Sequence, residues 1–461
     1  MTTNKAFKRV VRARMAKTGE RYAAARRSLI DANAEIPTSA VTVESTAGPT
    51  AYRLRGGLHP ETATLANVLA NQGVVSGLTG EPLTEAAILG IGGGLGAGYI
   101  LWEFKSHGAP VLTLGFRNQW QYPWIPGWTG KTLERLGIEA DVHQTGGAKG
   151  AREALDARLD AGEPVIASVD LQEMGTWGQP DARSGIYGHT VVIAGRESDG
   201  TYLVDDRGNA PFRITPDVMA AARGRIGSFK HRIVRLQTAE GPIPADRLRA
   251  ALQAGLVDQV DHLRSGSDSF SLPAWRKWAR MMTDGRNTKA WPRVFANGQG
   301  LFGALLGIVE AVDANVSPGG GHLRDLYAAS LDEAAVALDR PALTDAADAW
   351  RRAADAWDEL ADSAVPPDLD GADKAVDGAE TVRGAVNDGE TVRSAVNDGE
   401  AGRTRVRAAA DTAWEIRARY AESFPLPADR IDEILRGLGD QLTGIYQAEV
   451  DAVAATARAI R

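Results

Sequence analysis

The stretch that organises this chain is Gly56-Gly57-Leu58-His59-Pro60-Glu61-Thr62-Ala63-Thr64-Leu65-Ala66-Asn67-Val68-Leu69-Ala70-Asn71-Gln72-Gly73. Pro60 suits the first position of a helix, where its missing N–H group would have no partner in any case. The residues that follow at helical spacing, before the stop at Gly73, form a mostly apolar face: Leu65, Val68, Leu69 and Gln72. Such a helix start gathers backbone N–H groups and a partial positive charge, and nucleophiles and oxyanions are often held there. This stretch contains no strong nucleophile.

Length and composition narrow the class of protein. The 461 residues predict two or three domains, and 44% hydrophobic with 24% charged residues is typical of a globular protein. The net charge of -7 argues against nucleic acid as the main partner. The sequence has no Cys, which excludes disulfides, thiolate metal sites and Cys nucleophiles. We expect no metal and no cofactor.

Targeting and membrane signals are weak. The basic start of the chain lacks the apolar core of a secretory signal. The longest uncharged run, Ala86 to Trp102, is rich in Gly and short for a membrane span. We therefore expect a cytoplasmic protein with no membrane partner.

Patterns along the chain predict four regions. Residues 1–33 form a basic helical hairpin, for which a solvated pair of helices is favoured over contact with nucleic acid or an acidic partner. Residues 34–55 form a linker. Residues 56–237 form a mixed α/β domain, because strands are predicted at 110–115, 164–170, 189–195, 201–206 and 230–236. Residues 244–461 form an all-α domain, with a ten-residue repeat in an insertion at about 371–403. The Ala-rich helices near its end could support a homo-oligomer.

Two glycine motifs in the α/β region resemble nucleotide-binding patterns only superficially. Gly92-Gly93-Gly94-Leu95-Gly96-Ala97 fits G-x-G-x-x-A, but it follows a predicted helix and not a strand. Gly127-Trp128-Thr129-Gly130-Lys131-Thr132 ends like a phosphate loop, but its first Gly is two residues too close. We expect helix packing at the first motif and no nucleotide site at either.

His189 begins one predicted strand, and the next strand ends in Asp205-Asp206. Neighbouring hairpin strands can bring one of these carboxylates beside the imidazole, although the spacing does not decide which. A His held in this way can act as a general base, but a purely structural hydrogen bond fits the spacing equally well. The aromatic loop from Trp120 to Trp128 could line a pocket or fill the core. The Trp residues of the helical region are expected to be core and interface anchors.

The order of four motifs resembles the N-terminal domain of the butirosin biosynthesis protein H family. They are Gly56-Gly57-Leu58-His59, Leu89-Gly90-Ile91-Gly92-Gly93-Gly94-Leu95-Gly96, Gly188-His189-Thr190-Val191-Val192-Ile193 and Leu203-Val204-Asp205-Asp206. The helical part resembles DUF4872, the domain of unknown function that often follows it, through segments such as Trp275-Arg276-Lys277-Trp278, Asp284-Gly285-Arg286-Asn287 and Arg324-Asp325-Leu326-Tyr327. The resemblance implies an α+β architecture, with a papain-like, cysteine-peptidase-like domain followed by an all-α domain.

The resemblance also implies acyl transfer from a carrier-protein thioester to an amine. It places the family's catalytic Cys at Pro60, its His at His189 and its acid at Asp205, so the nucleophile is absent here. We expect His189 and Asp205 to be the catalytic pair. We expect the substrate-binding residues to be His59, Glu61, Trp120 and Tyr122.

Three functions follow. The first is a non-covalent acyltransferase-like protein of secondary metabolism, which takes an acyl carrier protein or a small acyl, amine or peptide-like substrate and uses His189 as a general base. The second is a binding or scaffold protein that has lost catalysis. The third, a hydrolase with Glu61 as nucleophile, has only proximity in its favour.

Overall fold

The computed structural model describes residues 42–43, 52–102, 110–118, 127–177, 184–185, 188–208, 210–237, 241–313, 320–366, 369, 408, 411 and 414–461. The predicted hairpin at 1–33, most of the predicted linker and the repeats at 371–403 lie outside these residues. So do Trp120 and Tyr122. Within the described residues, a mixed α/β region precedes a helical region, as the sequence predicts.

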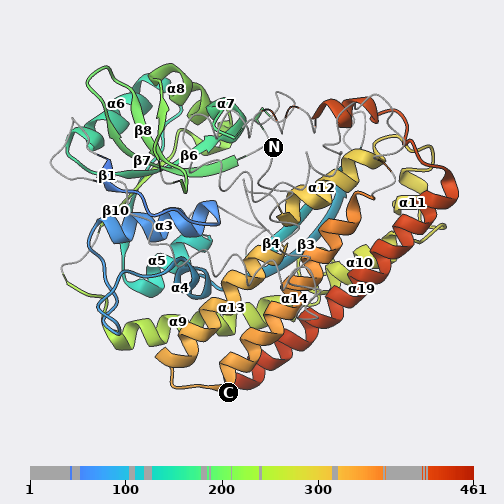
Figure 1. Ribbon diagram of the computed structural model, residues 1–461. Coiled ribbons are helices and arrows are strands. Elements are labelled where there is room, and N and C mark those ends of the chain that lie inside the picture. The colour runs from blue at the N-terminus through green and yellow to red at the C-terminus, as the bar shows by residue number, and fades with distance from the viewer. Residues whose placement is uncertain are drawn as a thin grey trace, which may run out of the picture.

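A six-stranded antiparallel sheet forms the centre of the α/β region (Figure 1). In spatial order its strands are β5 (Glu139–His143), β10 (Ile233–Gln237), β6 (Val165–Asp170), β7 (Gly188–Arg196), β8 (Tyr202–Asp205) and β9 (Phe212–Ile214). The four predicted strands between 164 and 236 are confirmed, whereas β5 and β9 were not predicted. The last strand, β10, does not close the sheet at an edge, because it pairs with β5 on one side and β6 on the other.

Each face of the sheet is covered by helices (Figure 1). Ile166, Val192 and Val234 share one buried cluster with Leu65 and Leu69 of α3 (Pro60–Asn71). On the opposite face, alternate residues of β6 and β7 share a second cluster with residues of three helices, α6 (Ala148–Asp160), α7 (Leu171–Met174) and α8 (Pro216–Gly224). This alternation between faces follows from the pleat of the strands, and it decides below which acidic side chain meets His189.

The predicted strand near 110–115 belongs to a different sheet. β3 (Leu95–Trp102) and β4 (Val111–Arg117) form a separate two-stranded antiparallel ribbon that packs against the helical region. Tyr99 of β3 stacks on Trp278 at a centroid distance of 5.4 Å, and its hydroxyl accepts a hydrogen bond from Trp291 Nε1 at 3.1 Å. Side chains of the ribbon therefore form part of the hydrophobic core of the helical region.

The glycine motif does not form the packed helix that the sequence predicts. It forms the turn from α4 (Glu85–Ile91) into β3 and the first residues of that strand, and Gly94 has a φ of +63°. A Cβ at Gly94 would lie 2.5 Å from the ring of Tyr327, so only Gly fits there.

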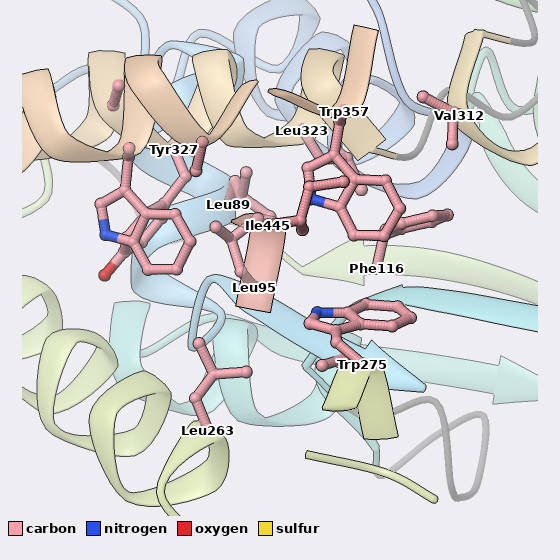
Figure 2. Packing of buried hydrophobic residues seen from close by; sticks show 14 of the residues in the cluster. Leu89, Leu95, Phe116, Leu263, Trp275, Val312, Leu323, Tyr327, Trp357 and Ile445 are labelled. Atoms are coloured by element: carbon pink, nitrogen blue, oxygen red, sulfur yellow. The ribbon is translucent and has the colours of Figure 1, made fainter. Parts of the chain in front are cut away.

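The described residues after 244 are mainly helical, and their helices include α9 (Ala245–Leu263), α10 (Pro273–Met281), α11 (Trp291–Val294), α12 (Leu301–Asp313), α13 (Gly320–Ala337), α14 (Ala342–Ala364) and α19 (Ala428–Ala459). The Trp residues expected to anchor this core are fully buried: Trp275, Trp278, Trp291, Trp350 and Trp357. Figure 2 shows Phe116 of β4 beside Trp275 and Trp357. The remaining short elements are β1 (Thr42–Val43), β2 (Tyr52–Arg53), α5 (Trp128–Leu136) and a 3₁₀ turn at Gly227–Phe229. Among the described helices, none combines the length and apolar character needed to cross a membrane.

Replacing Tyr327 with Phe is expected to raise the free energy of unfolding by about 1 kcal/mol. The Tyr327 side chain is fully buried, and its hydroxyl has no hydrogen-bond partner in the described part of the chain. An unpaired buried polar group destabilises the folded state, so its removal is favourable. Urea unfolding measures the effect, and Tyr99→Phe is the matched control, because loss of the bond from Trp291 should destabilise by a similar amount. A Tyr327→Phe variant less stable than wild type would show that the hydroxyl has a partner after all.

Candidate functional site

The site is built around the start of α3. Gly57 has a φ of +149°, and a Cβ there would lie 2.3 Å from the Cβ of Ala63, so the turn into the helix requires Gly. His59 is the N-cap residue, and its Nδ1 accepts a hydrogen bond from the N–H of Glu61 at 3.4 Å. Pro60 is the first helical residue, as predicted, and it is buried.

The carboxylate of Glu85 holds the loop that precedes α3. Its two oxygens accept hydrogen bonds from the N–H groups of Leu58 and His59, both at 2.8 Å. The hydroxyl of Thr62, one turn into the helix, donates to the same carboxylate at 2.6 Å. The backbone donors just before Pro60 are therefore already paired within the protein.

His189 pairs with Asp206 and not with Asp205. Its Nε2 lies 2.9 Å and 3.0 Å from the two carboxylate oxygens of Asp206, and both side chains are buried. The expected pairing with Asp205 is therefore corrected. In the β6–β7 register His189 is opposite Val169, which packs in the cluster away from α3. Asp206 follows the last residue of β8 and turns to that side.

Asp205 points to the α3 side of the sheet. It lies opposite Val192 in the register of β7 and β8. Its carboxylate accepts hydrogen bonds from the hydroxyl of Tyr52 at 2.8 Å, the side-chain amide of Asn67 at 3.2 Å and the N–H of Arg207 at 3.0 Å. Asp205 thus ties β2 and α3 to the end of β8 and does not orient the imidazole.

The two neighbouring carboxyl groups have opposite electrostatic behaviour. Burial raises the pKa of Asp205 from 3.8 to about 6, although its hydrogen bonds from Tyr52, Arg207 and Asn67 oppose the rise. Burial also acts to raise the pKa of Asp206, but the charges of His189 and Arg207, with hydrogen bonds from His189 and Trp177, outweigh it. The pKa of Asp206 is therefore held well below its usual range, and Asp206 is the permanently charged partner of His189.

Arg207 joins the His189–Asp206 pair to the loop before α3. Its Nε donates to Asp206 at 3.1 Å, its Nη1 donates to the carbonyl of Leu58 at 2.8 Å, and its guanidinium lies 5.1 Å from the centre of the Trp177 ring. Arg207 has a φ of +63°, which is unusual for a residue other than Gly and is found at sites that position functional groups.

His59 lies in the electrostatic field of this group. Burial, followed by the charges of Arg117, Arg207 and His189, lowers the pKa of His59 well below its usual value, so its imidazole is neutral at pH 7. Glu61 forms an ion pair with Arg117, whose guanidinium lies 4.7 Å from the centre of the Trp128 ring. Of the residues predicted for the site, the structure thus brings together His59, Pro60, Glu61, His189 and Asp205.

Two family models match this chain. Residues 59–207 match the family model of butirosin biosynthesis protein H, N-terminal, and residues 291–391 match that of a domain of unknown function, DUF4872. The chain therefore carries the N-terminal domain of the butirosin biosynthesis protein H family followed by DUF4872, which confirms the resemblance predicted from sequence. Membership of the first family suggests an acyltransferase-like biosynthetic protein. No curated protein matches the chain.

Three residues that shape the site were not predicted from the sequence. Arg207 directly follows Asp205-Asp206, so its place in the chain could have suggested a role. Nothing in the local sequence pattern around Glu85 indicates contact with Leu58 and His59. Trp177, whose Nε1 donates to Asp206 at 2.6 Å, has no distinctive local signal.

Proposed function

We propose that this protein transfers an acyl group directly from a carrier-protein thioester to an amine, with His189 as general base. The observation that supports this function most is the buried, two-oxygen contact between His189 and Asp206. A carboxylate held in this way fixes the orientation of the ring and stabilises its protonated form. In this proposal Asp206, and not Asp205, is the acidic residue that orients His189. We also propose that the α/β domain has a cysteine-peptidase-like fold.

The reaction would proceed without an acyl–enzyme. Pro60 has neither a nucleophilic atom nor an N–H group, so the family's covalent route is closed at this position. The amine nitrogen would attack the thioester carbon as His189 takes its proton through Nδ1, because Nε2 faces Asp206. This attack forms the C–N bond. The C–S bond then breaks, and the proton passes from the imidazolium to the leaving thiolate.

A second candidate, a binding protein without catalysis in secondary metabolism, rests on two observations. The His189 side chain is only 1% exposed, so a substrate would reach it only after a rearrangement. The N–H groups of Leu58 and His59 are held by Glu85, so they are not available to stabilise an oxyanion. Such a protein would bind an acyl carrier protein, or an acyl or peptide-like molecule, at the start of α3.

Replacing His189 with Ala is expected to lower acyl transfer by about 100-fold or more, which is the usual contribution of a general base. The protein is incubated with acyl-loaded carrier proteins and a panel of amines, and the amide product is measured by mass spectrometry. His262→Ala, on α9, is the control and should retain activity. Product that forms equally well without His189 would contradict its role as a base. Carrier binding with no product from any carrier would overturn the enzymatic proposal in favour of the binding protein.

A further inference from the structure

We propose that Glu85 is the positioning residue of this site and that the helical region acts on the site through it. This inference rests on the proposed function only in locating the site at the start of α3. It concerns how the loop carrying His59 and Pro60 is held, so it can be tested without any acyl-transfer activity.

Three donors converge on the Glu85 carboxylate: two consecutive backbone N–H groups and the hydroxyl of Thr62. Hydrogen bonds to an ionised acceptor are stronger than those between neutral groups. An amide side chain could not replace this carboxylate, because its NH₂ group would face one of the N–H donors. The loop is also held from the other side, since Arg207 donates to the carbonyl of Leu58. The peptide groups of Leu58 are therefore fixed by Glu85 at one end and by Arg207 at the other.

The helix that carries Glu85 is itself held by the helical region. Thr84, the N-cap of α4, donates to both oxygens of Glu333 of α13, at 2.8 Å and 2.9 Å. At the other end of α4, Gly90 lies so close to α13 that a Cβ would be 2.0 Å from the hydroxyl of Ser330. Thus α13 contacts both ends of α4, and a shift of α13 would move Glu85 and the loop with it.

Replacing Glu85 with Ala in the full chain is expected to speed amide hydrogen exchange at Leu58 and His59 by about tenfold or more, because both amides lose their acceptor. Added formate should restore protection in this variant, since it can return a carboxylate to the vacated place. Glu85→Gln should be only partly protected. Glu81→Ala removes a nearby exposed carboxylate and is the matched control, with no change and no response to formate.

The link to the helical region is tested in the same way. Glu333→Ala should increase exchange at Leu58 and His59 by less than Glu85→Ala does, whereas Val336→Ala, at a position of α13 that is 85% exposed, should have no effect. No change at Leu58 and His59 in Glu85→Ala would overturn the proposal. Recovery with chloride as complete as with formate, at equal ionic strength, would also overturn it, and no change in Glu333→Ala would overturn the link to α13.

A readout specific to site geometry uses Pro60→Cys as a reporter. A thiol at this buried helix start should have a lowered pKa, which the ultraviolet absorbance of the thiolate reports without access of a reagent. Adding Glu85→Ala should shift the pH profile of thiolate absorbance, and formate should reverse the shift. A profile that does not move would show that Glu85 is merely structural. If acyl transfer fails in every assay while these results hold, only the proposed function is wrong.

Discussion

Replacing Glu449 with Ala is expected to lower the free energy of unfolding by about 3–5 kcal/mol. The Glu449 carboxylate is fully buried and accepts hydrogen bonds from Arg324 Nε at 2.7 Å, Trp275 Nε1 at 2.9 Å and Trp357 Nε1 at 2.7 Å. Removing it leaves the guanidinium of Arg324 buried without a counter-charge. Stranding a charge in this way destabilises a protein far more than the loss of a surface ion pair.

This cluster also holds the two regions together, which adds to the expected effect. The remaining nitrogens of Arg324 donate to the carbonyls of Phe116 and Gly96, both at 3.0 Å, so one side chain joins α13 to both strands of the ribbon. Trp275 and Trp357, which flank Phe116 in Figure 2, bring α10 and α14 into the same contact.

Urea unfolding of Glu449→Ala measures the effect. Glu433→Ala is the control, because Glu433 lies on the same helix in an exposed pair with Arg430 and should contribute less than about 1 kcal/mol. Glu449→Gln, which keeps an acceptor but loses the charge, should fall between the two. Equal losses for the alanine variants at positions 449 and 433 would show that the buried cluster contributes no more than a surface pair.

The substitutions Asp205→Asn and Asp206→Asn are expected to change the pH dependence of stability in opposite directions. The folded-state pKa of Asp205 is raised to about 6, so folded protein retains a proton that the unfolded chain releases at lower pH. Stability is therefore lost as pH rises from about 4 to about 6, by up to about 3 kcal/mol. Asp205→Asn should remove this loss and gain stability relative to wild type across that window.

The stability contribution of Asp206 depends on pH with the opposite sign. Its folded-state pKa lies below that of the unfolded chain, so its contribution to stability is present above about pH 4 and is lost as pH falls further. Asp206→Asn should be destabilised at pH 7 by about 3 kcal/mol, because His189 and Arg207 lose their shared carboxylate.

Urea unfolding of wild type and both variants from about pH 2 to pH 8 separates the two effects, because the contribution of Asp206 is lost only below about pH 4. The difference from wild type is the informative quantity, since all other titrating groups are common to the three proteins. Parallel curves for Asp205→Asn and wild type between pH 4 and pH 6 would contradict the raised pKa of Asp205. An Asp206→Asn variant as stable as wild type at pH 7 would contradict the role of the Asp206 carboxylate as the shared partner of His189 and Arg207.

Local sequence patterns were sufficient to predict many features of this protein. The helix after Gly57, with Pro60 at its first position, follows from turn and helix-start preferences that act over a few residues. The strands near 164–170 and 189–195 follow from their apolar runs between turns. The absence of Cys and the Pro at the nucleophile position are direct properties of the sequence, and the order of motifs identified both families.

Only the tertiary structure decided how these parts meet. Asp205 and Asp206 are equivalent in spacing, and the register of β7 and β8 determines that Asp206 faces His189. The contacts of Glu85 with Leu58 and of Arg324 with Glu449 join residues that are far apart in sequence, so no local pattern encodes them. The ribbon β3–β4 leaves the main sheet because its apolar faces pack against helices that come later in the chain. Periodicity shows that a face is apolar, but the partner that buries it is decided by the free energy of the whole fold.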